Sequence, residues 1–124
     1  MPTVLVVEDE WVIAEALAMT LADAGYEVIT AANGKQALAS LAETRPDVIV
    51  TDTMMPILDG PGLLAALAAD PAHRDIPVVL MSALDGAAVA KLVQGQRAFL
   101  GKPFLGPELL RVLEQILGNA AKRP

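Results

Sequence analysis

Short apolar runs alternate with segments of helical periodicity along the whole chain. Five of these runs have the length of strands, and they cover residues 3–7, 26–31, 47–52, 76–82 and 97–101. The first run, TVLVV, is apolar almost throughout, which is typical of a parallel strand that is covered on both faces. The pattern therefore predicts a five-stranded parallel sheet.

Between the runs, apolar residues recur at the three- and four-residue spacing that places them on one face of a helix. The residues that carry this pattern are Ile13, Leu17 and Leu21; Ala37, Leu38 and Leu41; Leu63, Leu64 and Leu67; and Leu109, Val112, Leu113 and Ile116. Gly25 has the position of a stop after the first helix. Asn33 has that of an N-cap before the second, with Gln36 three residues later, and Pro61 suits the first turn of the third. A shorter helix is expected around residues 87–94.

Strands that alternate with helices imply a doubly wound α/β fold, in which right-handed crossovers place helices on both faces of the sheet. The chain has 124 residues, which suits one domain with one core. We expect that domain to cover residues 1–118 and a polar tail to follow over residues 119–124.

Composition narrows the class of protein. The net charge of −6 weighs against direct binding of nucleic acid, which favours a basic face. The absence of cysteine excludes disulfides and thiol chemistry. No apolar run is long enough to cross a bilayer and no signal-peptide pattern precedes Glu8, so a cytoplasmic location is expected.

Polar residues follow the predicted strands at their carboxyl ends, which is where open α/β sheets bind their ligands. These residues are Glu8 and Asp9 after the first strand, Asp52 at the end of the third, Ser82 at the end of the fourth and Lys102 after the fifth. Each one alone is explained as a cap, a turn residue, a local hydrogen-bonding group or a solvated side chain. Together they predict a cluster of carboxylates, a hydroxyl and an ammonium group at one edge of the sheet.

This set of groups fits the chemistry of phosphoryl transfer. Clustered carboxylates repel one another unless a cation lies among them, and oxygen ligands without His or Cys suit Mg²⁺. Lys102 can bind a phosphate oxygen as a point charge, and Ser82 can bind another through its hydroxyl. A carboxylate in such a site can form an aspartyl-phosphate, and we predict that Asp52 is that nucleophile.

Four motifs occur in order along nearly the whole chain: VLVVEDE, TDTMMPILDG, VVLMSA and AFLGKPF. With them the chain resembles the receiver domains of two-component response regulators, of the single-domain type. The resemblance implies a flavodoxin-like (βα)5 fold with the strand order 2-1-3-4-5. It also implies a signalling protein that is not an enzyme in the usual sense, whose phosphotransfer and slow dephosphorylation are catalysed by the domain itself.

The resemblance implies a role for each site residue. Asp52 matches the phosphoacceptor, and Lys102 and Ser82 match the residues that assist phosphoryl transfer. The groups expected at Mg²⁺ are Asp9, Asp52 and the backbone carbonyl of Met54, with Glu8 acting through water. Ser82 and Phe99 match the pair of residues that switches conformation in this family.

The expected phosphodonor is a phosphohistidine on a histidine kinase or a phosphotransfer protein, and the expected output is contact with a protein target. Neither nucleic acid nor a membrane is expected to bind directly. Two alternatives remain open: a phosphorelay intermediate, and a degenerate receiver used only as a binding module. A phosphatase of the haloacid dehalogenase kind is disfavoured, because its general acid would be a second Asp two residues after Asp52, where Met54 stands.

Two further features bear on output and partners. The segment between Ser82 and Lys102 is shorter than is usual in the family, and Gln96 stands where a small residue commonly follows Gly95. We expect these departures to affect output through the fourth helix but not phosphorylation. Trp11 stands beside the acid pair, and it is either a partly buried aromatic that covers the first helix or an anchor for a helical bundle of the partner.

Overall fold

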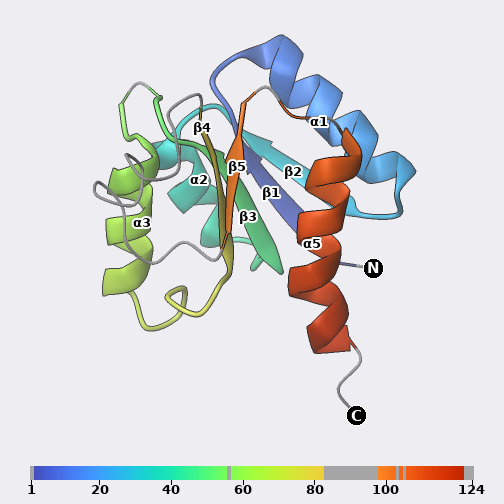
Figure 1. Cartoon of the computed structure of the whole chain (residues 1–124). Coiled ribbons are helices and arrows are strands. Elements are labelled where there is room, and N and C mark those ends of the chain that lie inside the picture. The colour runs from blue at the N-terminus through green and yellow to red at the C-terminus, as the bar shows by residue number, and fades with distance from the viewer. Residues whose placement is uncertain (1, 56, 83–97, 103, 105, 122–124) are drawn as a thin grey trace.

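The computed structural model describes residues 2–55, 57–82, 98–102, 104 and 106–121, with five strands and four helices among them (Figure 1). The strands are β1 (Thr3–Val7), β2 (Glu27–Ala31), β3 (Val48–Asp52), β4 (Val78–Ser82) and β5 (Ala98–Gly101). The helices are α1 (Trp11–Asp23), α2 (Gly34–Leu41), α3 (Gly60–Ala69) and α5 (Gly106–Ala121). In this described part of the chain, no helix has both the length and the apolar character needed to span a membrane.

All five strands are parallel, and their order across the sheet is β2-β1-β3-β4-β5. This confirms the predicted flavodoxin-like order. In the register, Leu5 of β1 is paired with Ile29 of β2 on one side and with Ile49 of β3 on the other. The strand order therefore reverses between β1 and β3, and the carboxyl ends of these two strands are where such a sheet binds ligands.

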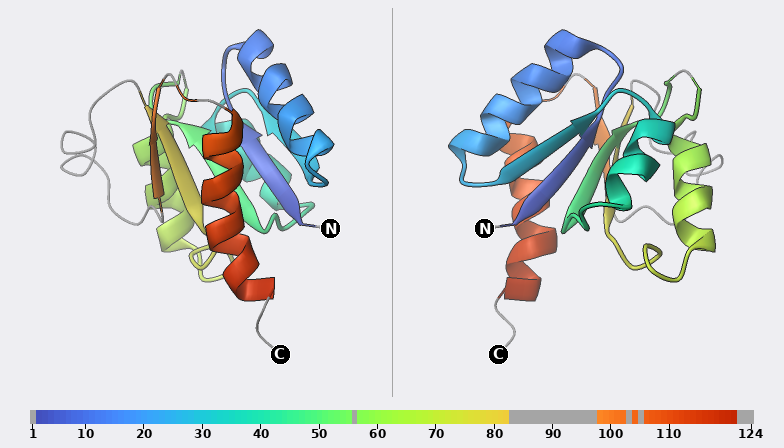
Figure 2. Two further views of the ribbon diagram at one scale, coloured as in Figure 1. Left: turned by 45° about the vertical axis from the view of Figure 1, so that its right-hand side comes forward. Right: turned by 180° about the vertical axis from the view of Figure 1, so that it is seen from behind.

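Two helical layers enclose the sheet, with α1 and α5 on one face and α2 and α3 on the other (Figure 2). Successive side chains of a strand point to opposite faces, so alternate residues of β1 reach different layers. Val6 packs in one core with Leu21 and Leu113, and Leu5 packs in the other with Leu63. Leu5 and Val6 are at most 1% exposed although they point to opposite faces of the sheet, which accounts for the almost continuous hydrophobicity of β1.

Side-chain caps fix the starts of two helices near the carboxyl ends of the strands. Asn33, the predicted N-cap of α2, accepts a hydrogen bond of 2.9 Å from the backbone N–H of Gln36. Asp59 caps α3 in the same way and accepts from the N–H of Gly62 at 2.9 Å. Pro61 lies in the first turn of α3, as predicted. The caps therefore fix the points at which the loop after β2 ends at α2 and the loop after β3 ends at α3.

The structure differs from the sequence prediction mainly at the ends of elements. β3 begins at Val48 and β4 at Val78, slightly later than the predicted ranges. α5 continues to Ala121, so the helix includes residues 119–121 of the segment predicted as a polar tail. Ala120 and Ala121 are good helix formers that add little to an apolar stripe, so the stripe ends before the helix does. The helix expected around residues 87–94 lies outside the described residues.

Candidate functional site

Three carboxylates lie together at the carboxyl ends of β1 and β3. Glu8, Asp9 and Asp52 each offer an oxygen atom, and these atoms lie within 4.8 Å of one another. Glu8 is 2% exposed and Asp52 is partly buried, whereas Asp9 is exposed. Because Val7 is paired with Thr51 in the parallel register, the residues that follow them come level with each other. The structure thus brings together the acids that the sequence analysis expected to converge.

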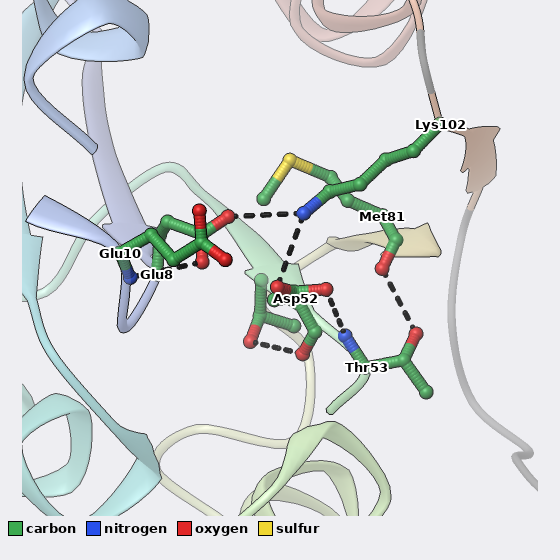
Figure 3. A network of polar contacts seen from close by, with 7 residues as sticks. Glu8, Glu10, Asp52, Thr53, Met81 and Lys102 are labelled. Carbon is green, nitrogen blue, oxygen red and sulfur yellow. Dashed lines mark hydrogen bonds and ion pairs between the residues drawn. The ribbon is translucent and has the colours of Figure 1, made fainter. Parts of the chain in front are cut away.

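The ammonium group of Lys102 bridges two of these carboxylates (Figure 3). Its Nζ lies 3.0 Å from Oε1 of Glu8 and 3.1 Å from Oδ2 of Asp52. The lysine follows β5, and its backbone N–H donates to the carbonyl of Ser82 on β4 at 2.7 Å. This backbone bond fixes the start of the side chain beside the end of β4, from where it extends to the acids on β1 and β3.

The charges of this cluster do not balance. Burial raises the pKa of Glu8 to about 7; the hydrogen bond from Lys102 opposes this shift, and the charge of Asp52 adds to it. Burial by itself would lower the pKa of Lys102, but its hydrogen bonds to Glu8 and Asp52 outweigh that effect and raise it. One ammonium group among three carboxylates leaves an excess of negative charge that a divalent cation would neutralise. The oxygen-only donor set fits Mg²⁺.

Backbone groups hold Asp52 and the loop behind it. The N–H of Thr53 donates to Oδ1 of Asp52 at 2.9 Å. After the loop, the chain comes back to the end of β3 at Gly60. The N–H of Gly60 donates to the carbonyl of Thr53 at 2.9 Å. A Cβ atom on Gly60 would lie 2.7 Å from the backbone oxygen of Asp52, closer than non-bonded atoms pack, so the loop can close here only on glycine.

Three further predicted residues lie on β4, on β5 and in the loop after β3. Ser82 ends β4 and is 2% exposed, and its backbone is paired with Gly101 of β5. Met54 follows Thr53 and is 69% exposed. Phe99 is paired with Leu80 in the β4–β5 register, and its side chain lies outside the described part of the chain. The topology therefore places the predicted switch residues on two neighbouring strands.

Trp11 begins α1 beside the acid cluster and is 73% exposed, so the reading of this residue as a partly buried cover for the helix is wrong. Val12 and Met19 on the same helix are 68% and 63% exposed. Next to this surface, a largely apolar cavity of about 630 Å³ lies between α1 and the start of α5, with Val12 and Phe104 among its lining residues. Three large apolar side chains of α1 are thus exposed.

Thr53 is a site residue that the sequence pattern does not reveal. It is 1% exposed, and its hydroxyl donates to the carbonyl of Met81 on β4 at 2.9 Å. In the sequence it is one threonine in a polar stretch, TDT, after the apolar part of the strand. The partner of the hydroxyl is 28 residues away along the chain, so only the β3–β4 pairing reveals the contact.

Known proteins resemble this chain in sequence over most of its length. A family model described as the response regulator receiver domain matches residues 4–114. The chain is 41% identical over 118 residues to the transcriptional regulatory protein PrrA of Mycobacterium tuberculosis, covering 94% of this chain and 50% of that protein. It is 37% identical over 114 residues to the protein PilG of Pseudomonas aeruginosa, covering 90% and 84%. The chain thus spans about half the length of PrrA and most of the length of PilG.

Solved structures give the same result. The signal receiver domain of a signal transduction histidine kinase from Syntrophus aciditrophicus has a TM-score of 0.90 at 32% identity, over 100% of this chain and 96% of that one. A chemotaxis response regulator of Vibrio cholerae has a TM-score of 0.88 at 33% identity, over 94% and 98%. The receiver domain of a sensor histidine kinase from Pseudomonas aeruginosa, with a magnesium ion coordinated in its active-site cleft, has a TM-score of 0.85 at 31% identity, over 94% and 98%.

Proposed function

Because the chain belongs to the family of response regulator receiver domains, we propose that it accepts a phosphoryl group on Asp52 from a phosphohistidine on a histidine kinase or phosphotransfer protein. Receiver domains of two-component systems are signalling domains, and this fixes the class of function. The observation that carries the assignment to Asp52 is its position in the cluster, partly buried, with one oxygen paired to Lys102.

The chemistry is a transfer between two nucleophiles. An oxygen of the Asp52 carboxylate forms a bond to phosphorus while the phosphorus–nitrogen bond to histidine breaks, and the bonding electrons leave with the imidazole nitrogen. Lys102 neutralises charge on the phosphoryl oxygens from its place beside Oδ2 of Asp52. Slow hydrolysis of the same acyl phosphate then returns the domain to its unmodified state.

Mg²⁺ would be held by Asp9, Asp52 and the backbone carbonyl of Met54, with Glu8 acting through water. The acid cluster and its excess negative charge support this proposal. So does the magnesium ion in the cleft of the Pseudomonas aeruginosa receiver domain. When bound, the ion supplies positive charge to the phosphoryl oxygens.

The output of phosphorylation is proposed to be a change at Ser82 and Phe99. A phosphoryl group adds about −1.5 to −2 units of charge and three strong acceptor oxygens. Lys102 can pair with one oxygen, and the hydroxyl of Ser82 can move to donate to another. Phe99, on the strand next to Ser82, would then turn inward and change the surface of β5 and α5 that a protein target contacts.

The phosphodonor is proposed to dock on α1. Trp11, Val12 and Met19 are exposed apolar residues of this helix, and Trp11 lies two residues after Asp9 of the site. A donor protein must bring its phosphohistidine to Asp52, so a surface at the rim of the site serves both docking and transfer. Exposed aromatic residues often contribute much of the energy of an interface.

We propose that the receiver domain covers residues 1–118. The family match over residues 4–114 supports this extent.

The test of this function is intact-mass spectrometry after incubation with acetyl phosphate and Mg²⁺. The wild-type protein should gain the mass of one phosphoryl group, and Asp52→Asn should gain none, because it lacks the nucleophilic oxygen. Asp75→Asn, at an exposed acid outside the cluster, is the control and should be labelled like the wild type. Equal labelling of Asp52→Asn and the wild type would refute the assignment.

A further inference from the structure

Thr53 makes two contacts with one carbonyl and a third with the phosphoacceptor. Its backbone N–H lies 3.0 Å from the carbonyl oxygen of Met81 and 2.9 Å from Oδ1 of Asp52. Its hydroxyl donates to the same carbonyl of Met81 at 2.9 Å (Figure 3). The N–H is therefore shared between two acceptors, and the side chain forms a second connection to one of them.

From this geometry we propose that the Thr53 hydroxyl is a positioning element for phosphoryl transfer, an inference that rests on the proposed role of Asp52. The hydroxyl fixes the peptide of Thr53 against β4, and this peptide's N–H fixes one oxygen of the Asp52 carboxylate. The other oxygen, Oδ2, then stays directed at Lys102, 3.1 Å away. Thr53 itself acts through its neighbour and does not touch the transferred group.

The position of Thr53 in the fold explains why a second connection matters there. β3 ends at Asp52, so Thr53 is the first residue beyond the paired strand. The chain then turns through Ile57, which has a left-handed backbone with φ of 70°, before it reaches α3. An N–H bond alone would allow the peptide of Thr53 to tilt with this loop, and the hydroxyl bond restrains that tilt.

The hydrogen bonds of Thr53 are shielded from solvent. Thr53 is 1% exposed, so water does not compete well for its hydrogen bonds. Met81, the acceptor of both bonds, directly precedes Ser82 in the chain. The same contact therefore ties the phosphoacceptor to the strand end that carries the proposed switch hydroxyl.

Removal of the hydroxyl by Thr53→Val keeps the shape of the side chain and is the direct test. With acetyl phosphate, the maximal labelling rate should fall about three- to tenfold, because small misplacements of a reacting group cost rate steeply. The dissociation constant for Mg²⁺, measured by titration of the intrinsic fluorescence of Trp11, should change by less than about twofold, since no proposed ligand is removed. Thr53→Ser, which keeps the hydroxyl, should restore most of the rate.

Thr51→Val is the matched control. Thr51 is 0% exposed, two residues away, and its hydroxyl also donates to a backbone carbonyl, that of Asp52, at 3.1 Å. This variant should lose a similar amount of thermal stability but keep the labelling rate. If Thr53→Val does not fold, Thr53→Ala removes the same hydroxyl and is held to the same expectation.

The outcomes separate this inference from the proposed function. A wild-type protein that is not labelled overturns both. A labelled wild type with an unchanged rate in Thr53→Val overturns only the role of Thr53. Equal loss of rate in Thr51→Val, or a parallel loss of Mg²⁺ affinity in Thr53→Val, also overturns it, because the effect would then be general destabilisation or loss of the ion.

Discussion

At the residue scale, Glu8 shows what burial does to a carboxylate that the site needs. It directly follows β1 and is almost fully buried, it accepts hydrogen bonds from Lys102 and from the backbone N–H of Glu10, and its pKa is raised to about 7. The folded protein therefore binds the proton of Glu8 more tightly than the unfolded chain does. By linkage, the stability that Glu8 contributes is present below about pH 4.5 and is lost as the pH rises towards 7.

This linkage gives a prediction for Glu8→Gln. In EDTA, the melting temperature of the wild type should contain a component that falls between pH 4.5 and 7, and the variant should lack it, because its side chain has no proton to release. The difference between the two proteins, read by circular dichroism, should amount to a few degrees across this range. Millimolar Mg²⁺ should reduce the loss in the wild type, since the ion stabilises the ionised cluster. Parallel curves for the two proteins would contradict this role for Glu8.

At the element scale, α1 combines two surfaces with different tasks. Its inward residues, such as Leu17 and Leu21, pack against the sheet in the core shared with α5. Its outward residues include Trp11 and Val12, which are exposed although both are apolar. Large apolar side chains that stay exposed on a helix often mark a contact with a partner, which supports the proposed docking of the phosphodonor on α1.

Trp11→Ala separates docking from chemistry. Transfer from a phosphorylated histidine kinase that labels the wild type should slow about tenfold or more, because a central aromatic contact of an interface is lost. Labelling by acetyl phosphate should stay unchanged, since this small donor needs no docking surface. Met19→Ala, two turns further along α1, should have a smaller effect. Equal slowing with both donors would place Trp11 in the chemistry instead of in docking.

At the scale of the whole molecule, a local charge change must be converted into a different surface. The available energy comes from contacts that exist only after phosphorylation, since a ligand shifts an equilibrium only by its different interaction with the two states. A new hydrogen bond from Ser82 to a charged phosphoryl group contributes roughly 1.5–3 kcal/mol, which is enough to change populations by tenfold or more. Lys102 exchanges its pairing with Asp52 for one with the phosphoryl group, so its net contribution is smaller.

Beryllofluoride, which stands in for the phosphoryl group, tests this conversion. Crystal structures with and without it should differ in the rotamers of Ser82 and Phe99, and amide NMR shifts should change along β5 and α5 as well as at the site. Asp52→Asn treated in the same way should give no change, because the acceptor oxygen is missing. If both rotamers stay the same in the wild type, the signal leaves the domain by another surface.

Most of the elements and the chemistry of the strand ends can be predicted from local sequence. The apolar run of β1, the periodicity of α1 and the cap at Asn33 depend on residues close to one another along the chain, so local patterns were sufficient to predict them. The residue types at the strand ends also predicted which chemistry to expect. The cap at Asp59 is not evident from the sequence, because a residue before Gly60 and Pro61 looks like part of a turn.

How these groups meet depends on the packing of the whole fold. Lys102 and Glu8 are 94 residues apart, and their contact depends on the order of the strands and on the parallel register of β1, β3, β4 and β5. The contact of Thr53 with Met81, the burial that raises the pKa of Glu8 and the exposure of Trp11 are likewise properties of packing. They depend on which residues from distant parts of the chain surround a group, and a one-dimensional pattern carries no record of those neighbours.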